Sequence, residues 1–266
     1  MTARLVALDI DGTVLDIDEV ISDRVRTAVA DAVAAGTHVV IATGRSLHGT
    51  LPVLDRLGLV EGWAVCSNGA ITLRLDPALP DGYEIHDTVT FDPAPALRML
   101  REHLPTALYL VEDDRAERKV TADFPDGELS GDPLVVPFEE LMAEPVTRVV
   151  VRSPEHTPED FLATVERIGL HGVSYAVGWT AWLDLAPDGV SKASALEVVR
   201  QRLGVAPQDT VAVGDGRNDV EMLAWAARGV AMGQAVAEVQ AVADEVTASV
   251  EDDGVAVVLE DLLARR

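Results

Sequence analysis

Short apolar segments alternate with amphipathic segments over roughly the first eighty residues, and the alternation returns after about Pro187. Leu5–Leu8 and the run from His38 to Ala42 are typical of buried strands, and Ser22 has the chemistry of an N-cap for a helix between them. The apolar residues of that helix follow helical spacing, at Val25, Ala28, Val29, Ala32 and Val33. Short strands separated by helices indicate a parallel sheet with right-handed crossovers. The sequence therefore predicts the α/β fold class.

The middle of the chain has a different pattern. A segment rich in turn residues, Pro77–Gly82, ends the first alternating region. Beyond it we predict strands near 84–91, 106–112, 146–152 and 173–184, helices near 93–103 and 157–168, and a polar loop at about 113–133. Such a mixture indicates a small α+β domain with one covered sheet face. The simplest interpretation is one α/β core, residues 1–82 plus 187–266, interrupted by an inserted α+β domain at 83–186.

The chain is strongly acidic, because 21 Lys and Arg residues against 45 Asp and Glu give its 266 residues a formal net charge of −24. A broad basic face for nucleic acid or anionic lipid is therefore not expected, whereas a locally positive pocket for a small phosphorylated molecule is compatible with this charge. The first residues lack the pattern of a signal peptide, and no uncharged apolar run has membrane-spanning length. A lone Cys66 fits a reducing compartment. We expect a cytoplasmic protein without nucleic-acid or membrane partners, and take a monomer as the default.

Two carboxylates, Asp9 and Asp11, directly follow the first predicted strand. Side chains two positions apart on an extended backbone lie on the same side, so these like charges are expected close together. That arrangement is costly unless a cation or a shared proton relieves it. One interpretation is an ordinary strand that ends in a solvated acidic loop. The other is a magnesium site in which the first carboxylate, Asp9, is a nucleophile.

Three further polar clusters lie at predicted strand ends or helix starts, where open α/β sheets bind their ligands. They are Thr43-Gly44-Arg45, Lys192, and the turn from Gly214 to Asp219. Each has an ordinary structural interpretation by itself, as a helix entry, a solvent-exposed lysine or a common tight turn. Their combination with Asp9 and Asp11, in this order, is specific.

On these residues the chain resembles the Cof-type phosphatases of the haloacid dehalogenase superfamily, in the subclass whose large α/β cap is inserted between the second and third motifs. The matching motifs cover nearly the whole length: Asp-x-Asp-Gly-Thr at 9–13, Thr43-Gly44-Arg45, Ser67-Asn-Gly-Ala70, Lys192, Gly214-Asp-x-x-Asn-Asp219, Val230-Ala-Met-Gly233 and Asp253-Gly-Val-Ala256. The resemblance implies a Rossmann-like core with a parallel sheet and an α+β cap that selects the substrate. One departure is Gln234, where the family usually has Asn, and we expect it to be peripheral to the metal.

The resemblance also implies a role for each matching residue. Asp9 would attack phosphorus and form an aspartyl phosphate. Asp11 would act as general acid and base, a role that calls for a carboxyl group that is buried beside an acidic neighbour. Mg²⁺ would be bound by the Asp9 carboxylate, the Asp11 backbone carbonyl and Asp215. The other phosphoryl oxygens would be held by Thr43, Gly44, Lys192 and Asn218. Asp219 would position Lys192 or Asn218, with direct metal ligation left open, and Arg45 would either reach substrate or lie exposed at a helix start.

These roles predict Mg²⁺-dependent hydrolysis of a small phosphomonoester, such as a sugar phosphate. A phosphomutase is the nearest alternative, since it uses the same aspartyl phosphate but returns the phosphoryl group to the sugar. A non-catalytic ligand-binding module is an alternative of another class, although the intact carboxylate set argues against it. A P-type pump is excluded by the lack of membrane-spanning helices.

Several residues of the inserted domain and its surroundings are open to two interpretations. Among the tryptophans, Trp179 and Trp182 in the last predicted strands of the insert are the better candidates for substrate contact. The segment Glu112–Arg115 is most simply a solvated charged loop, and Ser67–Gly69 is explained equally well as a structural turn or as a ligand contact.

Overall fold

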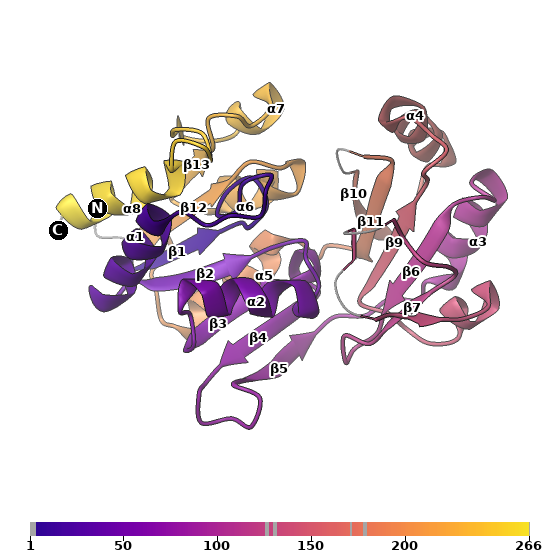
Figure 1. Cartoon of the computed structure of the whole chain (residues 1–266), viewed down its shortest axis with the longest axis horizontal. Helices are drawn as coiled ribbons and strands as arrows, with labels where there is room; N and C mark the ends of the chain where they lie inside the picture. Colours follow the sequence, from indigo (N-terminus) through magenta and orange to yellow (C-terminus); the bar gives the residue numbers. More distant parts are fainter. Residues whose placement is uncertain (1–3, 126–127, 130–131, 171, 178–179, 266) are drawn as a thin grey trace.

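The computed structural model describes residues 4–125, 128–129, 132–170, 172–177 and 180–265. These residues form two β-sheets, one of eight strands and one of six, each flanked by helices (Figure 1). The larger sheet is built from both ends of the chain and the smaller one from its middle. This arrangement confirms the predicted α/β fold class with a parallel-rich core sheet.

The larger sheet has the order β14-β13-β12-β1-β2-β3-β4-β5. Its strands are β1 (Leu5–Leu8), β2 (His38–Ala42), β3 (Gly62–Cys66), β4 (Ile71–Leu75), β5 (Tyr83–Thr88), β12 (Thr210–Gly214), β13 (Arg228–Ala231) and β14 (Glu245–Val246). The strands from β14 to β3 are parallel, whereas β4 and β5 add an antiparallel edge. Because β1 lies between β2 and β12, the carboxyl ends of these three strands meet at one edge of the sheet.

Alternating side chains of the larger sheet pack on two layers of helices. Val6 and Leu8 contact the layer of α1 (Asp23–Ala34), α2 (Leu47–Leu57) and α8 (Gly254–Ala264), whereas Leu5 and Ala7 contact the layer of α5 (Lys192–Arg202), α6 (Val220–Trp225) and α7 (Ala237–Gln240). Helix α1 begins as predicted, with the Ser22 hydroxyl accepting from the Val25 amide, although Val33 of its expected apolar face is 46% exposed. Both faces of the sheet are therefore covered, as near-continuous apolar strands require.

The smaller sheet has the order β10-β11-β9-β6-β7-β8. Its strands are β6 (Leu108–Glu112), β7 (Arg118–Val120), β8 (Leu134–Val135), β9 (Arg148–Arg152), β10 (Val173–Val177) and β11 (Trp182–Pro187). Helices α3 (Ala94–His103) and α4 (Pro158–Ile168) cover one face, where Tyr109 and Phe161 are fully buried. The other face carries a small apolar cluster around Leu110 and Val150. One covered face is what the sequence predicted for this segment.

Three details of the middle segment differ from the sequence-based expectation. The predicted strand near 84–91 is β5, which pairs with β4 in the larger sheet and not with the strands of the insert. The apolar run at 173–184 divides into β10 and β11, an antiparallel pair. Strand β7 lies within the predicted polar loop, because its Arg118 and Val120 are buried against neighbouring strands that the local pattern does not reveal.

The division into a core and an inserted cap stays a prediction. The pairing of β5 with β4 favours a first junction after Thr88, a few residues beyond the predicted boundary at 82. None of the helices in the described part of the chain has the length and apolar character needed to cross a membrane.

Candidate active site

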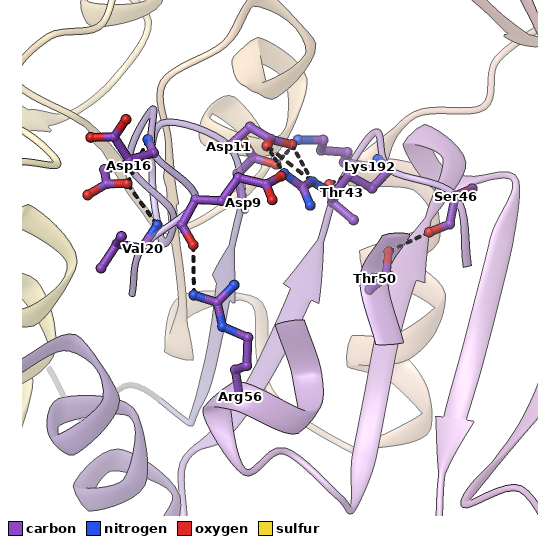
Figure 2. A network of polar contacts seen from close by, with 12 residues as sticks. Asp9, Asp11, Asp16, Val20, Thr43, Ser46, Thr50, Arg56 and Lys192 are labelled. Carbon is purple, nitrogen blue, oxygen red and sulfur yellow. Dashed lines mark hydrogen bonds and ion pairs between the residues drawn. The ribbon is translucent and has the colours of Figure 1, made fainter. Parts of the chain in front are cut away.

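The predicted site residues meet at the carboxyl edge of the larger sheet. Asp9 follows β1, and its amide donates to the Val213 carbonyl of β12 at 3.1 Å. Thr43 follows β2 and donates from its amide to the Val65 carbonyl at 2.9 Å. Figure 2 shows Asp9, Asp11, Thr43 and Lys192 gathered at these strand ends. The four clusters separated in sequence therefore come together, as expected for a ligand site of an open α/β sheet.

Lys192 connects two of the carboxylates. Its ammonium group lies 2.6 Å from Asp9 Oδ1 and 2.6 Å from Asp219 Oδ1. The Lys192 side chain is fully buried at the first turn of α5, where Ser191 caps the helix. Burial lowers the pKa of Lys192, but the adjacent charges of Asp219 and Asp9 outweigh it and raise the pKa above its usual value. Lys192 is thus a permanent cation in the site, and the exposed lysine of the ordinary interpretation is wrong.

Both carboxylate oxygens of Asp219 accept hydrogen bonds from neighbouring groups. Its Oδ1 accepts from Lys192, and its Oδ2 accepts from the backbone amides of Asp215 at 3.0 Å and Gly216 at 2.9 Å. With both oxygens engaged and the residue fully buried, Asp219 orients the Lys192 ammonium and shapes the loop that carries Asp215. This arrangement favours the positioning role over direct metal ligation.

Two glycines allow the close approach of the acidic loops. A Cβ atom at Gly12, whose φ is +70°, would lie 2.2 Å from Asp215 Oδ2. A Cβ atom at Gly214 would lie 2.5 Å from Cγ of Asp219. Both distances are far below van der Waals contact, so a side chain at either position would displace a carboxylate of the site.

Three carboxylates form a group that could hold a metal ion. Asp9, Asp215 and Asp219 each bring an oxygen within 4.8 Å of the others. Burial, with the charge of Asp219 as the next cause, raises the pKa of Asp9 well above its usual value and that of Asp215 to about 6. Among the described residues, no group donates a hydrogen bond to Asp9 Oδ2. Crowded carboxylates with an unengaged oxygen match the hard oxygen donors and the charge that a divalent cation such as Mg²⁺ prefers.

Asp11 does not have the buried environment expected for it. Its side chain is 59% exposed and receives a bidentate contact from Arg45, whose Nη2 lies 2.6 Å from Asp11 Oδ1. Arg45 also binds Glu19 at 2.8 Å. The expectation of burial was wrong because Asp11 lies in the loop beyond the strand end, where Arg45 of the next loop compensates its charge. Arg45 thus contacts a site residue and is not an isolated exposed arginine.

The phosphate-binding candidates surround the turn after β3. Gly44 and Asn218 line a cavity at the site, whereas Thr43 is fully buried beside it. The Asn218 amide donates to Asn68 Oδ1 at 3.0 Å, and the Asn68 backbone amide donates to the Thr43 carbonyl at 3.0 Å. Asn68 has a positive φ of 53°. This turn therefore links two phosphate-binding candidates, and Asn68 also lines the cavity, so both the structural interpretation and the ligand contact stay open.

Gln234 contacts Asp215, a candidate metal ligand, and its expected place peripheral to the metal stays a prediction. Its Nε2 donates to the Gly12 carbonyl at 2.6 Å and lies 3.4 Å from Asp215 Oδ2. Its Oε1 accepts from the Val250 amide at 3.1 Å. The longer side chain of Gln reaches across to both loops. The motif could have pointed to this contact, since Gln234 directly follows a Met-Gly pair that matches the family motif.

A cavity of about 390 Å³ lies between the carboxyl edge of the larger sheet and the open face of the smaller one. Trp182, predicted as a substrate contact, is among its lining residues, whereas Trp179 lies outside the described residues. Arg118 and Arg148 line the cavity too and were not singled out from the sequence, because their strands lay in or beside weakly patterned segments.

Glu112 is buried and not solvated. Its side chain is fully enclosed and accepts from the Ser67 hydroxyl at 2.5 Å, whereas Asp114 and Arg115 of the same segment are exposed. The expectation of a solvated run was wrong for its first member, because Glu112 still belongs to β6 and its side chain faces the other sheet.

Comparisons with known proteins show which family and fold the chain shares. The family model of haloacid dehalogenase-like hydrolases matches residues 6–259. The chain is 29% identical to the pyridoxal phosphate phosphatase YbhA of Escherichia coli, over 96% of this chain and 97% of the relative. It is 28% identical to the 5-amino-6-(5-phospho-D-ribitylamino)uracil phosphatase YitU of Bacillus subtilis, over 95% of this chain and 94% of the relative. A solved structure described as the HAD subclass IIB sugar phosphatase BT4131 shares the fold, with a TM-score of 0.82 at 24% identity, covering 97% of this chain and 98% of that one.

Proposed function

Because the chain belongs to the haloacid dehalogenase-like hydrolases and is a phosphatase of that family, we propose that it hydrolyses a small-molecule phosphomonoester with Mg²⁺ through an aspartyl phosphate on Asp9. One observation carries the proposal: the Lys192 ammonium lies 2.6 Å from Asp9 Oδ1, and Asp9 belongs to a carboxylate group able to hold a cation. Two relatives are named for small phosphorylated metabolites, pyridoxal phosphate and a phosphoribityl-aminouracil.

Asp9 is the nucleophile of this proposal. Its carboxylate attacks phosphorus, the new Asp9 O–P bond forms, and the bond from phosphorus to the leaving oxygen breaks. The charge of Lys192 favours the ionised form of Asp9, against the burial and the charge of Asp219 that raise its pKa. A lysine has three N–H donors, so one remains after Asp9 and Asp219 are bound. That third donor is available to a phosphoryl oxygen.

Asp11 is the general acid and then the general base. In the first step it gives its proton to the leaving oxygen, which departs as an alcohol. In the second step it takes a proton from water as the water oxygen attacks phosphorus, and the Asp9 O–P bond breaks to release inorganic phosphate. Arg45 holds Asp11 at the mouth of the cavity, so loosening of this ion pair would accompany the proton transfers.

Mg²⁺ would be held by the Asp9 carboxylate, the Asp11 backbone carbonyl and Asp215. When bound, it neutralises charge on the phosphoryl oxygens and on the crowded carboxylates. The remaining phosphoryl oxygens are proposed to accept from the Gly44 amide, the Asn218 side chain and the Thr43 hydroxyl. The Thr43 oxygen accepts from the Arg45 amide at 3.0 Å, which leaves the hydroxyl hydrogen free to donate.

Steady-state phosphate release tests the proposal. Purified protein is incubated with p-nitrophenyl phosphate and a panel of phosphorylated metabolites, with Mg²⁺ and with a chelator. We expect multiple turnovers that require Mg²⁺ and need no bisphosphate activator, and transient labelling of Asp9 by the phosphoryl group. Interconversion of sugar phosphates without phosphate release would instead establish a phosphomutase. Tight metabolite binding without any turnover would establish a non-catalytic module.

A further inference from the structure

The open face of the smaller sheet carries a row of charged side chains at the cavity. Arg118, Glu112 and Arg148 lie directly opposite one another on β7, β6 and β9, so their side chains share one face. All three are buried, with exposed fractions of 8%, 0% and 9%. Arg118 and Arg148 line the same cavity as Asp9 and Asn218. A substrate whose phosphoryl group lies at Asp9 would therefore extend its leaving group toward the two arginines.

Two carboxylates of this wall, Asp184 and Glu128, line the cavity, and neighbours within the wall already engage both, whereas Glu112 is fully enclosed and is not among the lining residues. Asp184 accepts from Arg148 Nε at 2.5 Å through Oδ1 and from Trp182 Nε1 at 2.8 Å through Oδ2. Glu128 is bound by Arg152 through both carboxylate oxygens, at 2.9–3.0 Å. These acceptors therefore orient the wall's own side chains and offer little to a leaving group.

Arg148 keeps donor capacity for a ligand. A guanidinium has five N–H donors, and within the described part of the chain only the Nε of Arg148 donates a hydrogen bond, to Asp184. The Nη atoms of Arg148 do not belong to the enclosed side-chain atoms that lack a hydrogen bond. The small exposed surface that the Arg148 side chain keeps lies at the cavity. Arg148 is thus a nine-tenths buried cation, held by Asp184, with its fork of Nη donors available to the cavity.

Because the carboxylates that line the cavity in this wall are engaged, the open Nη donors of Arg148 favour a ligand that brings acceptors alone. A polyol brings a hydroxyl hydrogen with each oxygen, whereas a carboxylate or phosphate brings only acceptor oxygens. A guanidinium binds such an oxyanion through two parallel N–H···O bonds. Burial lowers the pKa of Arg118, opposed by the charge of Glu112 and assisted by the charge of Arg148.

We propose that the leaving group of the substrate carries a second oxyanion, a carboxylate or a further phosphate, and that Arg148 binds it with Arg118 beside it. This inference rests on the proposed function, because it names the class of phosphomonoester that the same cavity accepts. Asp184 and Trp182 act as positioning residues, since they fix the guanidinium without contacting the oxyanion themselves.

Matched substrates test this inference on the wild-type protein. The compounds 6-phosphogluconate and sorbitol 6-phosphate differ in one terminal carboxylate, and fructose 1,6-bisphosphate and fructose 6-phosphate differ in one phosphate. We expect kcat/KM to be higher for at least one anionic member by roughly 10- to 100-fold, the effect of charge-assisted hydrogen bonds. A preference confined to one pair identifies the oxyanion as carboxylate or phosphate.

Arg148→Gln tests the residue. The variant should lose the preference for the anionic substrate, mainly through a higher KM, so that the ratio of kcat/KM between the anionic substrate and its neutral partner falls toward one. Measurable turnover of the neutral partner, at whatever rate, shows that the variant is folded. Arg98→Gln is the matched control, because Arg98 is exposed on α3, the helix on the opposite face of the sheet; it should behave as wild type.

Equal or better use of both neutral substrates by the wild-type protein would overturn the inference and leave the proposed function intact. An unchanged preference in Arg148→Gln would overturn the assignment to Arg148. Absence of phosphate release from every compound, including p-nitrophenyl phosphate, would overturn the proposed function itself and this inference with it.

Discussion

The Ser67 hydroxyl lies 2.5 Å from Glu112 Oε1, and this hydrogen bond joins the turn after β3 of the larger sheet to β6 of the smaller one. The second carboxylate oxygen, Oε2, has no hydrogen-bond partner among the described residues. Burial raises the pKa of Glu112, opposed by the charge of Arg148 and by the bond from Ser67. The single hydroxyl of Ser67 thus supports a buried carboxyl group at the junction of the two sheets.

Ser67→Ala should destabilise the protein by about 1–3 kcal/mol, because it leaves both Glu112 oxygens buried without a donor. The measurement is the free energy of unfolding in urea at neutral pH. Asp114→Ala, an exposed carboxylate two residues beyond Glu112, is the control and should change stability little. If Ser67→Ala and the control were equally stable, the hydrogen bond between Ser67 and Glu112 would make no contribution to the free energy of unfolding.

Replacing Lys192 by Met should impair both stability and turnover. Removal of the ammonium leaves Asp9 and Asp219 buried without their shared cation, a loss of about 3–5 kcal/mol for a broken buried ion pair. Thermal unfolding and kcat on p-nitrophenyl phosphate are the two readouts. Lys119→Met, at a half-buried position on β7, is the matched control. Wild-type kcat in Lys192→Met would contradict the role given to this residue.

Asp11→Asn should separate turnover from metal binding. The amide cannot exchange the proton that the leaving oxygen and the water require, so kcat should fall by about 10²- to 10⁴-fold. Mg²⁺ affinity, measured by isothermal titration calorimetry, should stay close to wild type because the proposed ligand of Asp11 is its backbone carbonyl. Asp9→Asn should abolish turnover and also weaken Mg²⁺ binding. Loss of Mg²⁺ affinity in Asp11→Asn would argue for a side-chain ligand instead.

The stabilising effect of Mg²⁺ should increase with pH. Burial and the charge of Asp219 raise the pKa of Asp215 from 3.8 to about 6. A carboxyl with a raised pKa stabilises the metal-free fold fully below its unfolded pKa, and this contribution is lost as pH rises through about 6. Mg²⁺ binds the ionised form, so the increase in Tm on adding Mg²⁺ should be larger near about pH 7.5 than near about pH 5.

Asp215→Asn provides the control for this pH dependence. The variant cannot ionise at this position, so its Tm should respond less to Mg²⁺ at both pH values. An equal response to Mg²⁺ in the variant and the wild-type protein would show that the cation binds elsewhere.

Much of the fold and of the site could be predicted from local patterns. The buried strands β1, β2 and β12 and the helix that begins after Ser22 follow from runs and periodicities of a few residues. The motif residues identified the family, and the match to the haloacid dehalogenase-like hydrolases confirms that resemblance. Strand β5 could not be assigned correctly, because its half-buried sequence fits either sheet and only its pairing with β4 decides between them.

By itself the sequence determined which residues end the parallel strands, and so which side chains gather at one edge of the sheet. Only the tertiary structure decided their partners: Arg45 bound to Asp11, Gln234 beside Asp215, and Glu112 enclosed next to Ser67. The physical reason is the distance along the sequence between the residues that interact. Strand and helix preferences depend on neighbours a few positions away, whereas an ion pair or a buried hydrogen bond depends on how distant segments pack, which no local pattern encodes.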